Sequence, residues 1–81
     1  MKNEIKLDSR YGTKNYLVKD TDKSYILNTE SPFIRTGMDG DNYVFIDPSG
    51  GPMIGIGSII ENMIVDKITH EQGKGYIITF R

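Results

Sequence analysis

The chain contains no cysteine and only one histidine among its 81 residues. Without cysteine, no disulfide and no thiolate metal site can stabilise a small fold. The single histidine, His70, lacks the further ligands of a zinc site, so we expect no metal and place His70 in a solvated loop. The fold must therefore rest on apolar packing, and a core of this size is marginal. Twelve isoleucines and three phenylalanines supply most of that packing.

Long apolar runs and an excess of one charge are also missing. No run approaches the ~18 residues needed to span a bilayer, and residues 1–6, MKNEIK, lack the apolar core of a signal peptide. The net charge of −1 argues against a broad phosphate-tracking surface, and so against nucleic acid as a partner. We expect a soluble, cytoplasmic protein that makes no membrane contact.

What the chain has instead is alternation of apolar and polar residues, interrupted by glycine, proline and aspartate. Ile5 and Leu7 point to one side of residues 4–11, and Lys6 points to the other, as in a half-buried strand. Further strands are predicted at 15–19, 24–28, 33–36 (a short edge strand), 42–46, 53–57 and 75–80, with a loop at 37–42 in which Asp39-Gly40 suits a positive-φ turn. We predict one domain over residues 1–81, all-β or β-rich α+β: a small antiparallel β-barrel or sandwich of about six to eight short strands.

Residues 58–72 have two interpretations. Residues 58–61, SIIE, form a capping-box pattern, and isoleucine recurs at every fourth position from 60 to 68, as on one face of a helix. Six β-branched residues within 59–69 favour strands instead. We prefer a strand at 64–69, with turns at Gly57-Ser58 and Glu61-Asn62 and a polar loop at 70–75. A short helix within 58–72 is the alternative.

Residues 47–52, Asp-Pro-Ser-Gly-Gly-Pro, have the chemistry of a hairpin turn. Aspartate first, proline second and glycine fourth fit a type I turn followed by a left-handed glycine. With residues 48–50 as the loop, Phe45 faces Met53 and Tyr43 lies over Gly55. This register puts Val44, Ile46, Ile54 and Ile56 on one face of the hairpin, and Tyr43, Phe45, Met53, Gly55 and Gly57 on the other.

The aliphatic face of this hairpin is the better core candidate. We predict a core that includes Ile46, Ile54, Ile56, Ile78 and Phe80. The second face is either covered by the N-terminal strands or forms a partly open shelf of aromatic ring, methionine and bare backbone. Such a shelf would suit a planar ligand or a protein partner.

The same turn could gather backbone N–H groups around an anion. It is neither a Walker loop nor a dinucleotide fingerprint, because no Gly-Lys-Ser/Thr and no helix start follow it. A plain hairpin apex is the simpler interpretation. If the turn is a ligand site, its residues are Tyr43, Asp47, Ser49, Gly50, Gly51 and Arg35, with Lys67 and Arg81 as further cations. We expect no cofactor.

Other candidate sites are weaker. Asp39, Asp41 and Asp47 do not have the spacing of a calcium loop, and turn propensity explains them. The chain has no nucleophile elbow, no paired histidine and serine signal and no carboxylate pair at a defined spacing, so we expect no catalytic residue and no enzyme. Four tyrosines could stack on bases as in OB-type barrels: Tyr11, Tyr16, Tyr25 and Tyr43.

These observations favour a small non-enzymatic protein that acts through protein–protein contacts, as a homo-oligomer, because a short chain without staples often completes its core at a subunit interface. The first alternative is a protein that binds or sequesters a nucleotide-like or other anionic small molecule, for example to inhibit a signalling or defence pathway. The second alternative is a single-stranded nucleic-acid module.

Overall fold

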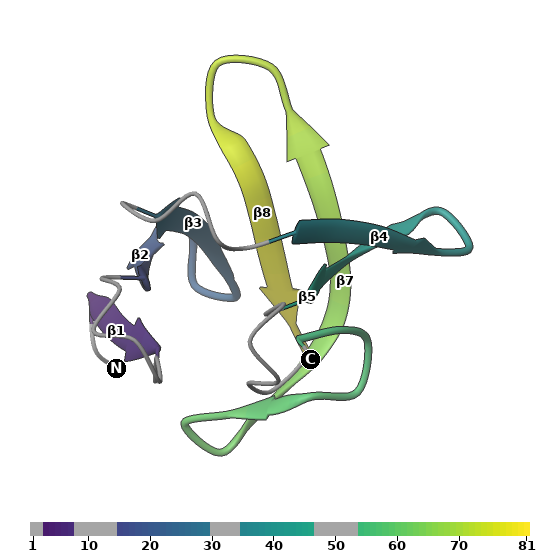
Figure 1. Ribbon diagram of the computed structural model, residues 1–81. Coiled ribbons are helices and arrows are strands. Elements are labelled where there is room, and N and C mark those ends of the chain that lie inside the picture. Colours follow the sequence, from purple (N-terminus) through teal and green to yellow (C-terminus); the bar gives the residue numbers. More distant parts are fainter. Residues whose placement is uncertain (1–2, 8–14, 30–34, 47–53) are drawn as a thin grey trace.

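The computed structural model describes residues 3–7, 15–29, 35–46 and 54–81. In these residues the chain forms eight strands and no helix (Figure 1), which confirms the all-β prediction. The strands are β1 (Glu4–Leu7), β2 (Asn15–Lys19), β3 (Ser24–Thr29), β4 (Arg35–Asp39), β5 (Asn42–Ile46), β6 (Ile59–Ile60), β7 (Met63–Glu71) and β8 (Gly75–Phe80). The described part of the chain holds no helix with the length and apolarity needed to cross a membrane.

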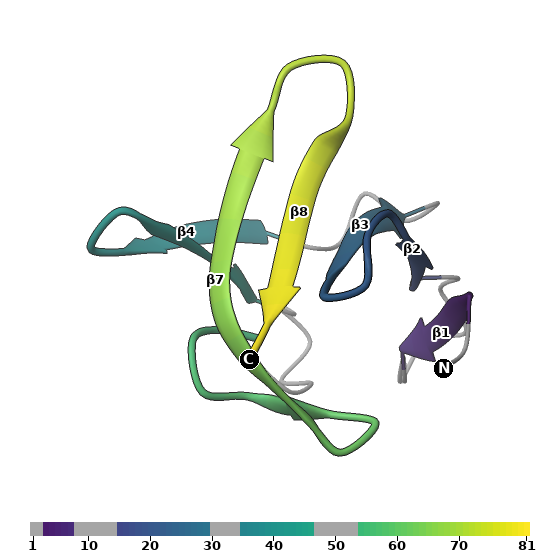
Figure 2. The ribbon, with the colours of Figure 1, turned by 180° about the vertical axis from the view of Figure 1, so that it is seen from behind.

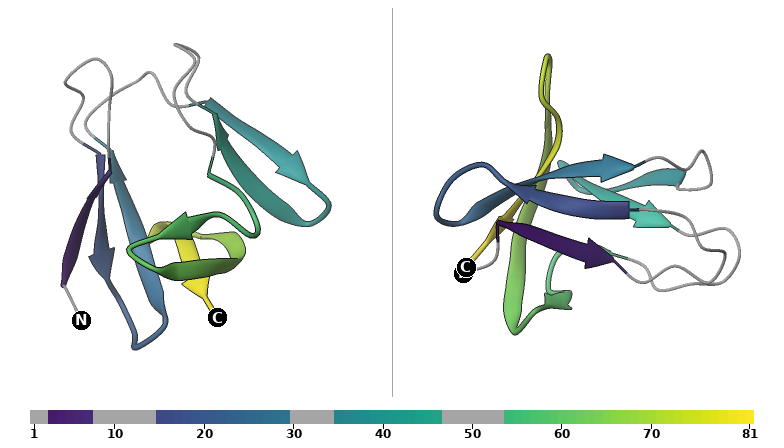
Figure 3. Two further views of the ribbon diagram at one scale, coloured as in Figure 1. Left: turned by 90° about the horizontal axis from the view of Figure 1, so that it is seen from below. Right: turned by 90° about the vertical axis from the view of Figure 1, so that its left-hand side faces the viewer.

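Six strands form one antiparallel sheet in the order β1-β2-β3-β8-β7-β6, and β4 and β5 form a separate two-stranded sheet. The larger sheet curls into half a barrel. Seen from below, β1 to β3 lie to the left of β7 and β8, and the β4–β5 hairpin lies to their right (Figure 3, left). Seen from behind, β7 crosses in front of the β4–β5 hairpin (Figure 2). The hairpin therefore packs against the inner face of the curled sheet.

The core lies on this inner face, toward which every second residue of a strand points. On β3, Tyr25 and Leu27 are buried, whereas Ile26 between them is only half-buried. Burying a large apolar side chain contributes about 1.5–3 kcal/mol, so this face supplies most of the stability. The largest wholly buried side chains are Tyr25, Leu17, Ile68, Ile78 and Val65.

A β-bulge at Asp66 explains why Val65 and Ile68, three residues apart on β7, both reach the core. Val65 pairs with Phe80 and Lys67 pairs with Thr79, so Asp66 is the extra residue. In a regular strand Val65 and Ile68 would point to opposite faces. The bulge shifts the alternation by one residue, and both side chains become fully buried.

The β6–β7 connection is a two-residue hairpin turn made by Glu61 and Asn62. Both have positive φ, 51° and 65°, as a type I′ turn requires. The predicted turn at Glu61-Asn62 is confirmed, and β7 confirms the strand interpretation of residues 64–69. The helical alternative is wrong, because its isoleucines do not share a buried face: Ile68 is fully buried, whereas Ile64 is exposed.

The predicted loop at 37–42 is wrong in extent. β4 continues to Asp39, which pairs with Asn42 at the start of β5, so only Gly40 and Asp41 form the turn. Gly40 has φ of 61°, as the predicted positive-φ turn requires. Backbone pairing between β4 and β5 therefore continues up to a two-residue turn. Gly40 permits this turn because glycine adopts positive φ without a steric penalty.

The register between β5 and the segment after residue 53 is shifted by one residue from the prediction. Phe45 and Ile54 exchange two backbone hydrogen bonds, at 2.9 and 3.0 Å, whereas the prediction paired Phe45 with Met53, which falls outside the described residues. Such a slip moves every side chain to the other face. Val44 accordingly lies beside Gly55, where an added Cβ would be 3.6 Å from the Val44 side chain. The predicted contact of Tyr43 with Gly55 is therefore wrong.

The slip also reverses the predicted core face of β5. Phe45 is 2% exposed and belongs to the core, and Tyr43 and Ile54 pack partly against it. Ile46 is only half-buried, and Ile56 is 41% exposed, so its core assignment is wrong. The core assignments of Ile78 and Phe80 are confirmed.

The strand predicted at 53–57 does not form in residues 54–57, because the chain turns there. Ile54 makes an isolated bridge to Phe45, and the Ser58 N–H then donates to the Gly55 carbonyl at 3.1 Å. Gly57, with φ of 87°, occupies the third position of this turn, as in type II. The Gly55 N–H donates to the Ser58 Oγ at 3.0 Å, which closes the turn a second time. The predicted turn at Gly57-Ser58 is confirmed.

Candidate functional site

Two of the six residues predicted for a ligand site, Arg35 and Tyr43, lie in the described part of the chain. Asp47, Ser49, Gly50 and Gly51 fall in residues 47–53, outside it. Arg35 pairs with Ile46 at the end of β5, and Tyr43 pairs with Met38 toward the other end. Three residues along a ladder span about 10 Å. The ladder therefore does not bring Arg35 and Tyr43 to one point.

The structure instead surrounds Tyr43 with other rings. The Tyr43 and Tyr76 centroids are 5.1 Å apart, and those of Phe45 and Tyr76 are also 5.1 Å apart, both edge to face. The His70 ring lies 5.0 Å from Tyr76 and 6.3 Å from Tyr43. We call Tyr43, Phe45, His70 and Tyr76 the aromatic cluster. Edge-to-face pairs of this kind contribute about 0.5–1.5 kcal/mol each beyond area burial.

Strand register and one side-chain hydrogen bond assemble this cluster. His70 on β7 stands directly opposite Tyr76 on β8, and Tyr43 and Phe45 share a face of β5 because they are two residues apart. The Asn42 Oδ1 accepts a hydrogen bond from the Ile68 N–H at 3.2 Å. This bond fastens the start of β5 to β7, two residues from His70.

The cluster is buried at its base and open at its rim. Phe45 is fully buried, Tyr43 and Tyr76 are half-buried, and His70 is exposed. Met38, the cross-strand neighbour of Tyr43, is 59% exposed. Such a surface can hold a flat apolar or aromatic group by stacking, and it offers an imidazole and phenol groups for hydrogen bonds.

Sequence reasoning identified Tyr43 but missed Tyr76 and treated His70 as a residue in a polar loop at 70–75. His70 and Glu71 belong to β7, and only residues 72–74 join β7 to β8. Period-two spacing from Ile68 was a usable signal, because it places His70 on the inner face of an extended β7. The approach of β5 has no local signal in the sequence.

A second surface lies on the β6–β7 hairpin, where apolar side chains face solvent. Ile59 is 71% exposed, and its cross-strand partner Ile64 is 37% exposed. Ile56, in the turn before β6, is exposed as well. We call Ile56, Ile59 and Ile64 the isoleucine patch.

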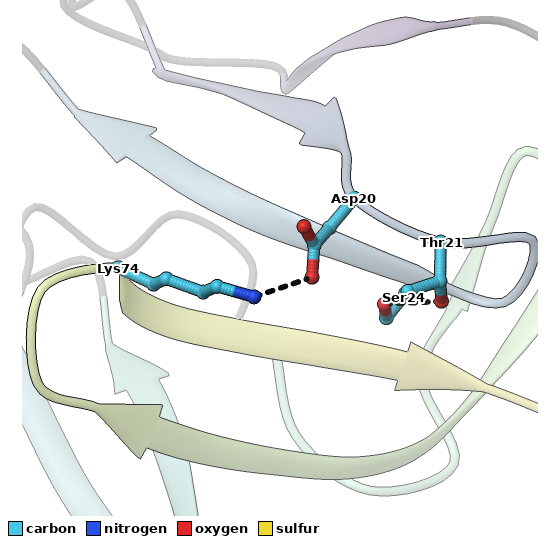
Figure 4. Close-up of polar contacts among 4 residues, drawn as sticks. All are labelled: Asp20, Thr21, Ser24 and Lys74. Atoms are coloured by element: carbon cyan, nitrogen blue, oxygen red, sulfur yellow. Dashed lines mark hydrogen bonds and ion pairs between the residues drawn. The ribbon is translucent and has the colours of Figure 1, made fainter.

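Two ion pairs between described residues lie apart from each other and form no shared site. Lys74 Nζ, in the β7–β8 turn, lies 3.5 Å from Asp20 Oδ2 after β2 (Figure 4). In the same view the Thr21 and Ser24 hydroxyls are hydrogen-bonded to each other within the β2–β3 connection. Arg81 Nε lies 3.7 Å from Asp66 Oδ1, and both side chains are more than half exposed. Exposed pairs like these contribute little to stability.

The other sequence candidates have these positions. Asp39 and Asp41 flank the Gly40 turn, and the described residues contain no group of three or more His, Cys, Asp or Glu that could hold a metal ion. Tyr25 is fully buried with its ring 5.5 Å from that of Phe80, so it is not available to stack on a base. Tyr16 is half-buried on β2, and Tyr11 lies outside the described residues.

Comparison of the chain with known protein families, curated proteins and solved structures finds no match.

Proposed function

We propose that this chain is a small non-enzymatic binding domain that acts through protein–protein contacts and associates with itself in the cytoplasm. The observation that carries the proposal is the exposure of large apolar side chains at two places, the isoleucine patch and Met38 on β4. Apolar groups that gather on the surface of a small protein mark contact surfaces when they are contiguous. Ile59 and Ile64 are direct cross-strand neighbours and meet that condition.

The size of the chain supports self-association. A domain of about 80 residues without disulfides or metal obtains only a few kcal/mol from its core, and subunit contacts are a common supplement. Burial of Met38 against a second copy would recover part of the transfer free energy that its exposure in the isolated chain leaves unrealised.

The mass in solution tests this proposal. Light scattering or sedimentation equilibrium over a wide concentration range should give a mass that rises from 9.2 kDa toward at least twice that value. A mass of 9.2 kDa at every concentration, up to the millimolar range, would contradict self-association.

The aromatic cluster favours a second candidate function, the binding of a planar, nucleotide-like or anionic small molecule. Tyr43, Tyr76 and His70 present partly open rings beside exposed Met38. Stacking of one base on an aromatic side chain contributes about 1–3 kcal/mol. A thermal-shift screen with nucleotides and anionic metabolites should then show a rise in melting temperature that Tyr43→Ala removes. No rise with any compound would remove the support for this candidate.

A further inference from the structure

Among the described strands, β4 lies at an edge of its sheet. In the part of the chain that the structure describes, β4 pairs only with β5, so the N–H and C=O groups on its other side have no strand partner. An unpaired edge is a template for another strand unless charge, proline or a bulge blocks it. β4, with the sequence RTGMD, contains no proline and pairs with β5 in unbroken register.

We propose that two copies of the chain pair antiparallel along β4, with Gly37 on the two-fold axis; this inference rests on the self-association proposed above. In that register position 35 of one copy stands opposite position 39 of the other, and position 36 stands opposite position 38. Position 35 is basic and position 39 is acidic in the sequence, so two charge-complementary pairs arise by symmetry. Met38, 59% exposed in the single chain, comes to lie beside the partner's Thr36.

The β1 edge offers a shorter match. In β1, with the sequence EIKL, Glu4 meets the partner's Lys6 only in a register centred on Ile5, which pairs three strand residues, whereas the β4 register pairs five. The β7 edge is already engaged at Ile68, whose N–H donates to Asn42. β4 is therefore the edge best suited to a second copy.

Pairing would also stabilise the smaller sheet. A two-stranded sheet is marginal alone, and three or more strands are needed for independent stability. Two β4–β5 hairpins joined at β4 form a continuous four-stranded sheet across the dimer. The isoleucine patch lies on a different hairpin and stays available to another protein.

A charge-reversal series tests the register. The dimer dissociation constant is measured by sedimentation equilibrium for the whole chain and for Asp39→Arg, Arg35→Asp and the double variant. Each single reversal places like charges opposite each other twice, and we expect the dissociation constant to rise about tenfold or more. The double variant restores both pairs and should return within about threefold of the original value. Circular dichroism and melting establish that each variant is folded.

Two control variants separate the alternatives. Asp22→Arg makes the same charge change in the β2–β3 turn, and Ile59→Ser removes the most exposed member of the isoleucine patch. Neither should change the dissociation constant. If Ile59→Ser weakens the dimer and Asp39→Arg does not, the patch is the interface; self-association then stands and pairing along β4 is overturned. Failure of the double variant to restore the affinity overturns the register. A chain that stays monomeric at every concentration overturns both proposals.

Discussion

Phe45 is the residue through which the β4–β5 hairpin reaches the core. It is almost fully buried, and its ring meets Tyr76 edge to face at 5.1 Å. We expect Phe45→Ala to lower the free energy of unfolding by about 3–5 kcal/mol, because it removes transfer energy and leaves a cavity. Urea denaturation measures the change. Ile56→Ala is the control: Ile56 faces solvent, and its loss should stay under about 1 kcal/mol. Equal losses in the two variants would contradict the face assignment.

Substitutions at Gly57 and Gly55 distinguish the cost of backbone strain from the cost of side-chain crowding. Gly57 has φ of 87°, and a Cβ there would meet nothing within 4 Å, so Gly57→Ala introduces strain alone. We expect this change to lower the free energy of unfolding by about 1–2 kcal/mol. A Cβ at Gly55 would make ordinary contact with Val44 at 3.6 Å, so Gly55→Ala should cost much less. Thermal denaturation of both variants measures the two losses. A larger loss for Gly55→Ala than for Gly57→Ala would show that a side chain at position 57 does not strain the turn.

At the scale of the element, the Asp66 bulge makes a prediction about deletions. Removing Asp66 leaves Val65 and Ile68 with one residue between them, so both still point inward on a regular strand. We expect this variant to keep a strand spectrum and a cooperative melt. Deleting Ile26 from β3 should be far more damaging, because it makes Tyr25 and Leu27 adjacent and forces one of them out of the core. If the two deletion variants gave the same melting curve, the assignment of Asp66 as a bulge residue would be contradicted.

The same elements indicate what the sequence could reveal. Period-two alternation was enough to find β2, β3 and β8, because one face of each is buried. The end of β4 was missed because its Gly37 and Asp39 resemble loop residues, although ladder pairing holds them in a strand. The core face of β5 was misassigned because it depended on one assumed turn length, and a shift of one residue exchanges the faces.

At the scale of the whole molecule, self-association makes stability depend on concentration. Binding that favours the folded chain raises the melting temperature by mass action. For a domain of this size, a hundredfold increase in protein concentration should raise the melting temperature by about 5 °C. Differential scanning calorimetry measures the shift, and Asp39→Arg should move its onset to about tenfold higher protein concentration if β4 is the interface. A melting temperature independent of concentration would oppose a dimer.

The candidate surfaces belong to this scale too, and they were the least predictable. Tyr43 was recognisable as an aromatic residue on a strand, but its neighbours come from the packing of β5 on β7 and β8. His70 and Tyr76 are brought together by a register that depends on the length of the β7–β8 turn. The exposure of Ile59 follows from its cross-strand position beside Ile64, whereas its hydrophobicity alone would have predicted a buried side chain.

The placement of β8 between β3 and β7 has a consequence for folding kinetics. The β1–β3 meander and the β7–β8 hairpin each form from neighbours in sequence, but the seam that joins them pairs Ser24 with Thr79. Closing so long a loop is entropically costly and slows folding relative to local contacts. The two halves are nevertheless complete supersecondary units. A chain cut between β3 and β4 should therefore reassemble from its two fragments, which would be held together by the backbone pairing of β3 with β8.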